Sequence, residues 1–228
     1  MFRINKNLIK IKNIETINLE NTSLTLKSKK YIEHFKEKKI KVLIDLEKLI
    51  RPKNDDYKII LGGSTISGKT CYSIYCERGE FESSIGSNVS IEFFRANPSF
   101  NSDIDVSLCD MPRWNGGVDC LIHTFICRAD GILLLFDVSS REDFDNLGYC
   151  MSMITNYLEV EDFPVLLIAN KIDLERAVLK EEIEKFKNDN GLIGYFGISW
   201  LKGINVKESF DFLMDYIIKK EKQDSNIN

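Results

Sequence analysis

The 228-residue sequence is poor in histidine and contains no closely paired cysteines. His34 and His123 are its two histidines, and its six cysteines form no CxxC pair, so no zinc cluster can be written. No apolar run approaches the ~20 residues that span a bilayer, and the N-terminal residues lack the apolar core of a secretory signal. A formal net charge of −4 argues against a basic nucleic-acid-binding face. These absences predict a soluble, reduced, cytoplasmic protein that does not bind nucleic acid.

Strand-like and helix-like segments alternate after residue 56. The apolar runs at 131–138 and 165–170 are continuous, as expected for buried parallel strands. Further strands are predicted at 57–61, 88–94, 104–108 and 192–198, and helices from 69 onward and at 142–158, 180–188 and 205–222. This alternation over short loops predicts an α/β fold. It has a mostly parallel central sheet of about six strands, with helices on both faces.

The first part of the chain has a different pattern. A proline and a charge cluster at 51–56 mark a boundary, so we predict an extension at 1–54, a main domain at 55–222 and a short polar tail at 223–228. Within the extension, residues 17–19 and 42–44 stand about 25 residues apart, a spacing found in leucine-rich repeats. Two partial copies are too few to bury a repeat core, so a βα or helical appendage is the favoured alternative. We expect the extension to supply a surface for partner binding or self-association.

Residues 63–70 (GSTISGKT) match the phosphate-loop pattern GxxxxGK[ST] between a predicted strand and a predicted helix. Glycines let successive N–H groups converge on phosphate oxygens, and the helix N-terminus favours negative charge. Lys69 is expected to reach the outer phosphates and Thr70 to ligate Mg²⁺. The predicted phosphate-binding residues are Gly63, Ser64, Thr65, Ile66, Ser67, Gly68, Lys69, Thr70 and the following Cys71. Because a β-branched residue resists a positive φ, Ile66 implies either a different local backbone or a strained loop with lower affinity.

The motif Asn170-Lys171-Ile172-Asp173 follows a predicted buried strand and indicates which nucleotide base the chain binds. The carboxylate of Asp173 can accept hydrogen bonds from the N1–H and the exocyclic amine of guanine, a donor pair that adenine lacks. Lys171 can lay its stem along the purine. Asn170 is expected to tie the base loop to the phosphate loop. Guanine is therefore favoured over adenine, and an ATP-using enzyme is disfavoured.

With these motifs in order, residues 57–219 resemble the Ras superfamily of small GTPases and are most similar to Rab proteins. Asp110 resembles the aspartate of the family's second metal motif, and Ser199-Trp200-Leu201 resembles its last guanine loop, although the family usually has alanine where Trp200 stands. The resemblance implies GTP/GDP and Mg²⁺ as ligands, contacts to the base from Ser199 and from the backbone N–H of Trp200, and protein effectors or regulators. It also implies a signalling role in vesicle trafficking. The sequence shows neither a C-terminal prenylation cysteine nor an N-terminal Met-Gly, so we predict no direct lipid anchor and membrane contact only through partners.

The segment Asp110-Met111-Pro112-Arg113-Trp114 departs from the family's DxxG-glutamine pattern. Arg113 replaces the glycine whose N–H would meet the γ-phosphate, and Trp114 replaces the glutamine that orients the attacking water. Arg113 as a built-in arginine finger is a weaker alternative, because it would have to leave the glycine's place. Slow or absent intrinsic hydrolysis is the favoured expectation.

The first switch is also irregular. Ser84, in Ser-Ile-Gly, resembles the family's metal-binding threonine, whereas Ser87 has the more typical separation from Thr70 and Asp110. Ser84 is favoured as the Mg²⁺ ligand over Ser87 and over a loop that supplies no side-chain ligand. Two functions remain open: a slowly hydrolysing Rab-like switch, or a nucleotide-stabilised interaction module that does not turn over.

Overall fold

The computed structural model describes residues 57–80, 91–112, 114, 125–126, 129–156, 158 and 163–226, together with the backbone of 16–18 and 41–43. The chain divides into two units, Met1–Asp55 and Asp56–Asn228. In the first unit, β1 (Thr16–Asn18) and β2 (Lys41–Leu43) pair in parallel, with Ile17 opposite Val42. These are the two segments that suggested a repeat, and their pairing suits both the repeat and the βα alternative.

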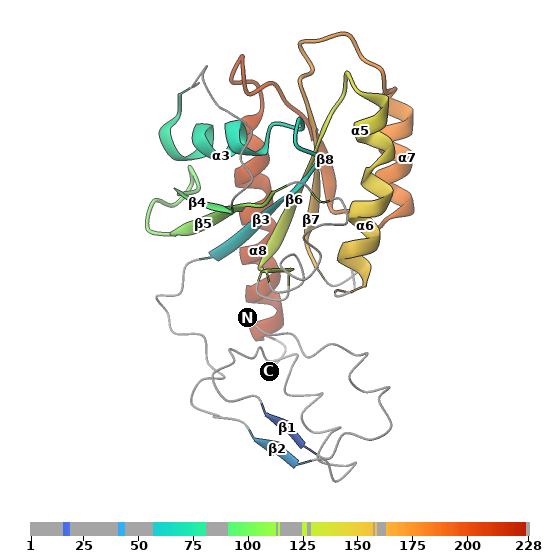
Figure 1. Cartoon of the computed structure of the whole chain (residues 1–228). Coiled ribbons are helices and arrows are strands. Elements are labelled where there is room, and N and C mark those ends of the chain that lie inside the picture. The colour runs from blue at the N-terminus through green and yellow to red at the C-terminus, as the bar shows by residue number, and fades with distance from the viewer. Residues whose placement is uncertain are drawn as a thin grey trace. The chain divides into compact units, whose positions relative to one another are not determined.

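The second unit contains a six-stranded sheet, as Figure 1 shows. Its strands, in spatial order, are β4 (Glu92–Ala96), β5 (Val106–Asp110), β3 (Tyr57–Gly63), β6 (Gly131–Asp137), β7 (Val165–Asn170) and β8 (Gly194–Gly197). All neighbouring strands are parallel except β4, which runs antiparallel to β5. The predicted α/β fold, with a mostly parallel sheet of about six strands, is confirmed.

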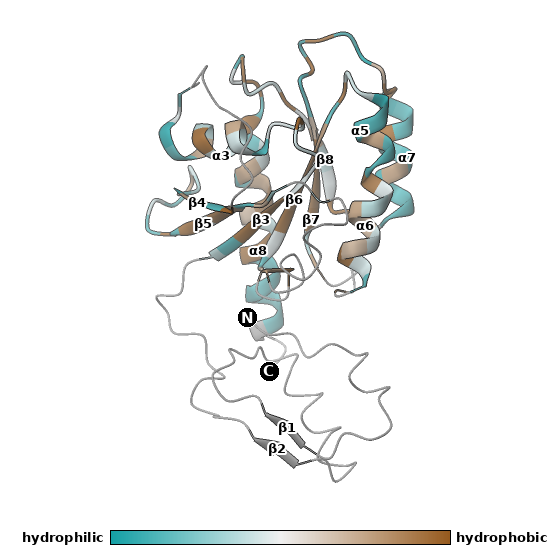
Figure 2. Cartoon of the chain, viewed as in Figure 1, coloured by the Kyte–Doolittle hydropathy of each residue, from teal (hydrophilic) through white to brown (hydrophobic). Residues whose placement is uncertain are grey.

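Helices cover both faces of this sheet (Figure 1). They are α3 (Lys69–Arg78), α5 (Arg141–Asp145), α6 (Leu147–Thr155), α7 (Lys180–Asp189) and α8 (Val206–Asn226). The side chains of β6 alternate between two cores: Leu134 packs with α5, α6 and α7, and Leu135 packs with α3 and α8. Figure 2 shows the resulting apolar strands between helices with polar outer surfaces. No helix in the described part of the chain is both long and apolar enough to cross a membrane.

Several predicted boundaries differ from the structure. Helix α8 continues to Asn226, through most of the segment that was predicted as a polar tail at 223–228. The antiparallel pair predicted at 88–94 and 104–108 lies at 92–96 and 106–110, because residues 97–105 form the connection. The Asn97 amide stabilises this turn by donating to the carbonyls of Ser102 and Ile104. The single helix predicted at 142–158 is two helices that meet at Asn146.

Candidate functional site

The phosphate loop connects the carboxyl end of β3 to the start of α3 (Figure 1). It therefore lies at the edge of the sheet where the parallel strands end. Gly63 and Gly68 have φ values of 134° and 89°. A Cβ would lie 2.2 Å from the Leu135 carbonyl oxygen at Gly63, and 2.4 Å from Asn170 Nδ2 at Gly68. Both positions therefore require glycine.

Ile66 has no positive φ, since Lys171 and Asn205 are the non-glycine residues with that conformation in the described chain. The strained loop, one of the two alternatives raised by its branched side chain, is therefore not observed. Its side chain is 56% exposed, and Thr65 beside it is also exposed. Ser67 is buried, and its hydroxyl donates to the Ser64 carbonyl at 2.9 Å. The loop therefore keeps its turn through the two flanking glycines and this internal hydrogen bond.

The Lys69 ammonium is buried and lies against the loop itself. It donates to the carbonyl oxygens of Gly63 at 3.2 Å and Ser64 at 2.5 Å. Burial lowers the pKa of Lys69, and the carboxylates of Asp110 and Asp143 oppose that effect. A buried cation held by loop carbonyls is suited to meet an anionic phosphate. Cys71, the third residue of α3, is half-buried, and burial raises the pKa of its thiol.

A hydroxyl and a carboxylate meet where a divalent cation would bind. The Thr70 hydroxyl donates to Asp110 Oδ2 at 2.5 Å, while Asp110 Oδ1 is buried without a hydrogen-bond partner. Burial raises the pKa of Asp110, and the Thr70 hydrogen bond and Lys69 oppose the shift. Hard oxygen donors with an unpaired buried carboxylate oxygen fit Mg²⁺. The candidate ligands Ser84 and Ser87, and Arg113, lie outside the described residues.

Asn170 joins the base motif to the phosphate loop. Its Nδ2 donates to the Ser67 carbonyl at 2.9 Å, and its Oδ1 accepts the Lys171 backbone N–H at 2.7 Å. Lys171 has a φ of 63°, and its Nζ pairs with the Asp137 carboxylate at 2.6 Å. Burial alone would raise the pKa of Asp137, but hydrogen bonds from Lys171 and Ser139 hold it below the usual value. Asp173, the last residue of the motif, is half-buried.

The last predicted guanine loop lies beside the same motif. Ser199 is buried, its backbone pairs with that of Ile204, and its hydroxyl accepts the Lys202 N–H at 3.2 Å. The Trp200 indole nitrogen lies 3.1 Å from the position that a Cβ on Gly68 would occupy. Leu201 is exposed. The structure thus brings both predicted base loops to the phosphate loop.

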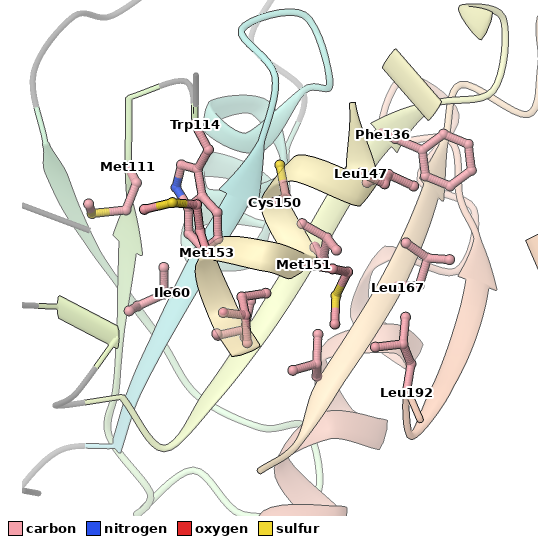
Figure 3. Close-up of a cluster of buried hydrophobic side chains, with 14 of the residues drawn as sticks. Ile60, Met111, Trp114, Phe136, Leu147, Cys150, Met151, Met153, Leu167 and Leu192 are labelled. Carbon is pink, nitrogen blue, oxygen red and sulfur yellow. The ribbon is translucent and has the colours of Figure 1, made fainter. Parts of the chain in front are cut away.

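Trp114 is a core residue. It therefore differs from the glutamine that the family has at this sequence position, which would face the phosphates. Its side chain is 0% exposed, and Figure 3 shows the ring among Ile60, Met111 and Met153. A Cβ on Gly62 would lie 2.9 Å from this ring, so glycine is needed there to admit the indole. The Trp114 backbone N–H also donates to the Gly63 carbonyl at 3.3 Å. Trp114 therefore anchors the segment after Asp110 in the hydrophobic core.

Replacing Trp114 should lower stability strongly. We expect Trp114→Ala to reduce the free energy of unfolding by about 3–5 kcal/mol, the usual cost of truncating a buried aromatic side chain. Trp114→Phe should cost less, because it keeps the ring and removes a buried Nε1–H that has no hydrogen-bond partner. Urea denaturation at one fixed GDP concentration measures both variants. The control is Phe100→Ala, since Phe100 is exposed; equal losses for Trp114→Ala and this control would contradict the anchoring role.

Two buried carboxylates of this region, Asp137 and Asp143, were missed by the sequence reasoning. Asp137 ends the apolar strand β6 and pairs with Lys171. Asp143 lies three residues after Ser140, whose hydroxyl accepts the Asp143 N–H at 3.2 Å. A Ser-x-x-acid pattern normally indicates an exposed helix cap, so it concealed the burial of Asp143. The acidic residue directly after a buried strand was the usable signal for Asp137.

Comparison with known proteins agrees with this geometry. The sequence model of the Ras family matches residues 58–219. The chain is 30% identical to the Ras-related protein Rab-32D of Dictyostelium discoideum over 185 residues, which cover 74% of this chain and 77% of that protein. It is 30% identical to Ras-related protein Rab-27A of Rattus norvegicus over 174 residues, covering 71% and 78%, and 29% identical to Ras-related protein Rab-12 of Homo sapiens over 176 residues, covering 75% and 70%.

The phosphate loop, the two base loops and the sheet that holds them define a nucleotide-binding switch domain of the small GTPase class. The chain belongs to the Ras family and is Rab-like within it.

Proposed function

We propose that this chain binds GTP and GDP with Mg²⁺ and acts as a Rab-like switch with slow intrinsic hydrolysis. The observation that carries the proposal is the hydrogen bond from Asn170 to the Ser67 carbonyl. It joins the residues that would read guanine to those that would hold phosphate. Thr70 and Asp110 would hold the Mg²⁺, which supplies positive charge to the phosphates.

The burial of Trp114 supports slow hydrolysis. Orienting an attacking water requires a side chain at the phosphate that can accept and donate hydrogen bonds. An indole offers one donor and no acceptor, and the Trp114 ring lies in the core. The same anchoring favours the second candidate function, a nucleotide-stabilised interaction module that does not turn over, because a pinned segment responds less to the γ-phosphate.

Nucleotide identification followed by single-turnover hydrolysis tests the proposal. We expect purified full-length protein to release GTP or GDP. With Mg²⁺, it should hydrolyse GTP more slowly than the roughly 10⁻⁴ s⁻¹ of unassisted relatives. No bound guanine nucleotide, together with no binding of added GDP, would overturn the function. A rate at or above that scale would overturn only slow hydrolysis, and persistent GTP would favour the interaction module.

The Rab-like relationship supports a role in membrane trafficking carried out through protein effectors or regulators. Residues 1–54 are proposed as a further surface for partner binding or self-association, because they belong to a compact unit of their own, Met1–Asp55. Light scattering during gel filtration of the full chain and of residues 55–228 compares their oligomeric states. We expect an oligomer only in the full chain. If both proteins are monomers, self-association through residues 1–54 is excluded.

A further inference from the structure

Asp137 lies at the carboxyl end of β6, next to the base motif at the end of β7. The two strands are parallel, and Asp137 stands opposite Asn170 in their register. The Val138 N–H donates to the Asn170 carbonyl at 3.0 Å and continues the contact beyond the strands. Lys171, the residue expected to lie along the purine, comes directly after this pair. The sheet therefore brings Asp137 beside the first residues of the base motif.

An ion pair ties the Lys171 side chain to Asp137. The Lys171 Nζ lies 2.6 Å from Asp137 Oδ2. The Asp137 side chain is 5% exposed and the Lys171 side chain 26%. Because a partly buried pair is screened by salt and water much less than a surface pair, this contact restrains Lys171. Without it, the ammonium would move on a long, flexible stem.

Asp137 is itself held in place by hydrogen bonds. Its Oδ1 accepts the Ser139 backbone N–H at 2.9 Å and the Ser139 hydroxyl at 2.6 Å. Its own backbone N–H donates to Asp143 Oδ2 at 2.7 Å. Burial would raise the pKa of Asp137, but the hydrogen bonds from Lys171 and Ser139 hold it below the usual value. The carboxylate is therefore ionised at neutral pH and presents Oδ2 to Lys171.

The Lys171 backbone is fixed as well. Its φ of 63° lies in the left-handed region, which is uncommon for a residue with a side chain. Its N–H donates to Asn170 Oδ1 at 2.7 Å. A backbone of this kind persists where its surroundings determine it, and it is common at ligand-binding sites. Lys171 is thus held at its backbone by Asn170 and at its ammonium by Asp137, with the aliphatic stem between the two contacts.

We propose that Asp137 is a positioning residue for nucleotide binding, which holds the Lys171 ammonium so that the Lys171 stem is in place for the purine. This inference rests on the proposed nucleotide binding. Asp137 acts through Lys171 and needs no contact of its own with the nucleotide. A side chain that is already held loses less freedom when the ligand binds, so affinity is higher. The stem lies along a ring face and serves any purine, whereas Asp173 selects guanine.

Isothermal titration calorimetry of the nucleotide-free full chain with GDP and Mg²⁺ provides the first test. Asp137→Asn keeps an oxygen for Ser139 and removes the charge that holds Lys171. We expect GDP affinity to fall about threefold to tenfold, the size of the cost of ordering one long side chain. Lys171→Met removes the other half of the ion pair and should cause a similar loss. The double variant should lose no more than either single variant, because residues in contact are not additive.

Nuclear magnetic resonance of bound GDP separates positioning at the base from a general structural loss. The phosphorus resonances should stay at their wild-type positions in Asp137→Asn, because Asn170 still joins the base motif to the Ser67 carbonyl. The C8 proton of the bound guanine should shift, because the Lys171 stem is no longer fixed along the ring. The control is Glu182→Gln, which breaks another ion pair between elements, to Arg141 at 2.8 Å. It should match wild type in affinity and in both spectra.

Three results would overturn the inference and leave nucleotide binding intact. They are wild-type GDP affinity in Asp137→Asn, losses that add in the double variant, and a guanine signal that stays in place while the phosphorus resonances move. If Asp137→Asn fails to fold, Lys171→Met decides, since wild-type affinity in that variant would also overturn the inference. No GDP binding by the wild-type chain would overturn both proposals.

Discussion

Lys69→Ala should reduce GDP affinity by at least about 100-fold. Lys69 is the buried cation at the centre of the phosphate loop, and its ammonium already lies against the Gly63 and Ser64 carbonyls. Two charge-assisted hydrogen bonds to phosphate, at about 1.5–3 kcal/mol each, account for a loss of about 10²–10⁴ in affinity. Titration of the nucleotide-free protein with a fluorescent GDP analogue measures the change.

Charge and packing at Lys69 can be separated. Lys69→Met keeps much of the aliphatic stem and should lose affinity as severely as Lys69→Ala while unfolding at a higher urea concentration. Lys58→Ala, on the exposed face of β3, serves as the control for removing a lysine. An affinity for Lys69→Met within a few fold of wild type would contradict the phosphate-binding role.

The strands of the sheet interior were predictable because their environment is uniform. Residues 131–137 and 165–170 are buried at every position, so the apolar run and the strand have nearly the same ends. At the edge of the sheet this relationship fails. In β4, buried and exposed residues are mixed, and Phe93 is exposed. The position of β4 is set by its pairing with β5 and by the Asn97 turn, neither of which leaves a local hydrophobic pattern.

The motif residues were predictable because their spacing encodes the ends of adjacent strands. Parallel strands deliver their carboxyl ends to one edge, and here Lys69, Asp110 and Asn170 follow or end β3, β5 and β7. The burial of Trp114 could not be predicted from motif spacing. Its sequence position indicated a loop beside the phosphates, whereas its burial depends on Gly62 in β3, 52 positions earlier in the chain. From the sequence, Gly62 looked only like the end of a strand. Its role, which is to leave space for the Trp114 ring, depends on packing between two distant segments.

Asp173→Asn should weaken GDP binding by about 10²–10⁴-fold and leave any weak binding of ADP nearly unchanged. A carboxylate that accepts from guanine N1–H and the exocyclic amine contributes two charge-assisted hydrogen bonds, and an asparagine amide can accept from only one of these donors. The remaining amide N–H faces a guanine donor, which adds repulsion.

We expect this loss to be confined to recognition of the base. Asn170 and Lys171, which join the base loop to Ser67 and Asp137, keep their contacts when only Asp173 changes. Phosphate binding through Lys69 should therefore persist, and the ratio of GDP to ADP affinity should fall while ADP affinity does not. Competition of both nucleotides against a fluorescent analogue measures that ratio, with Glu175→Gln, an exposed carboxyl in the same loop, as the matched control. Equal losses of GDP and ADP affinity would mean that Asp173 supports the loop and does not read guanine.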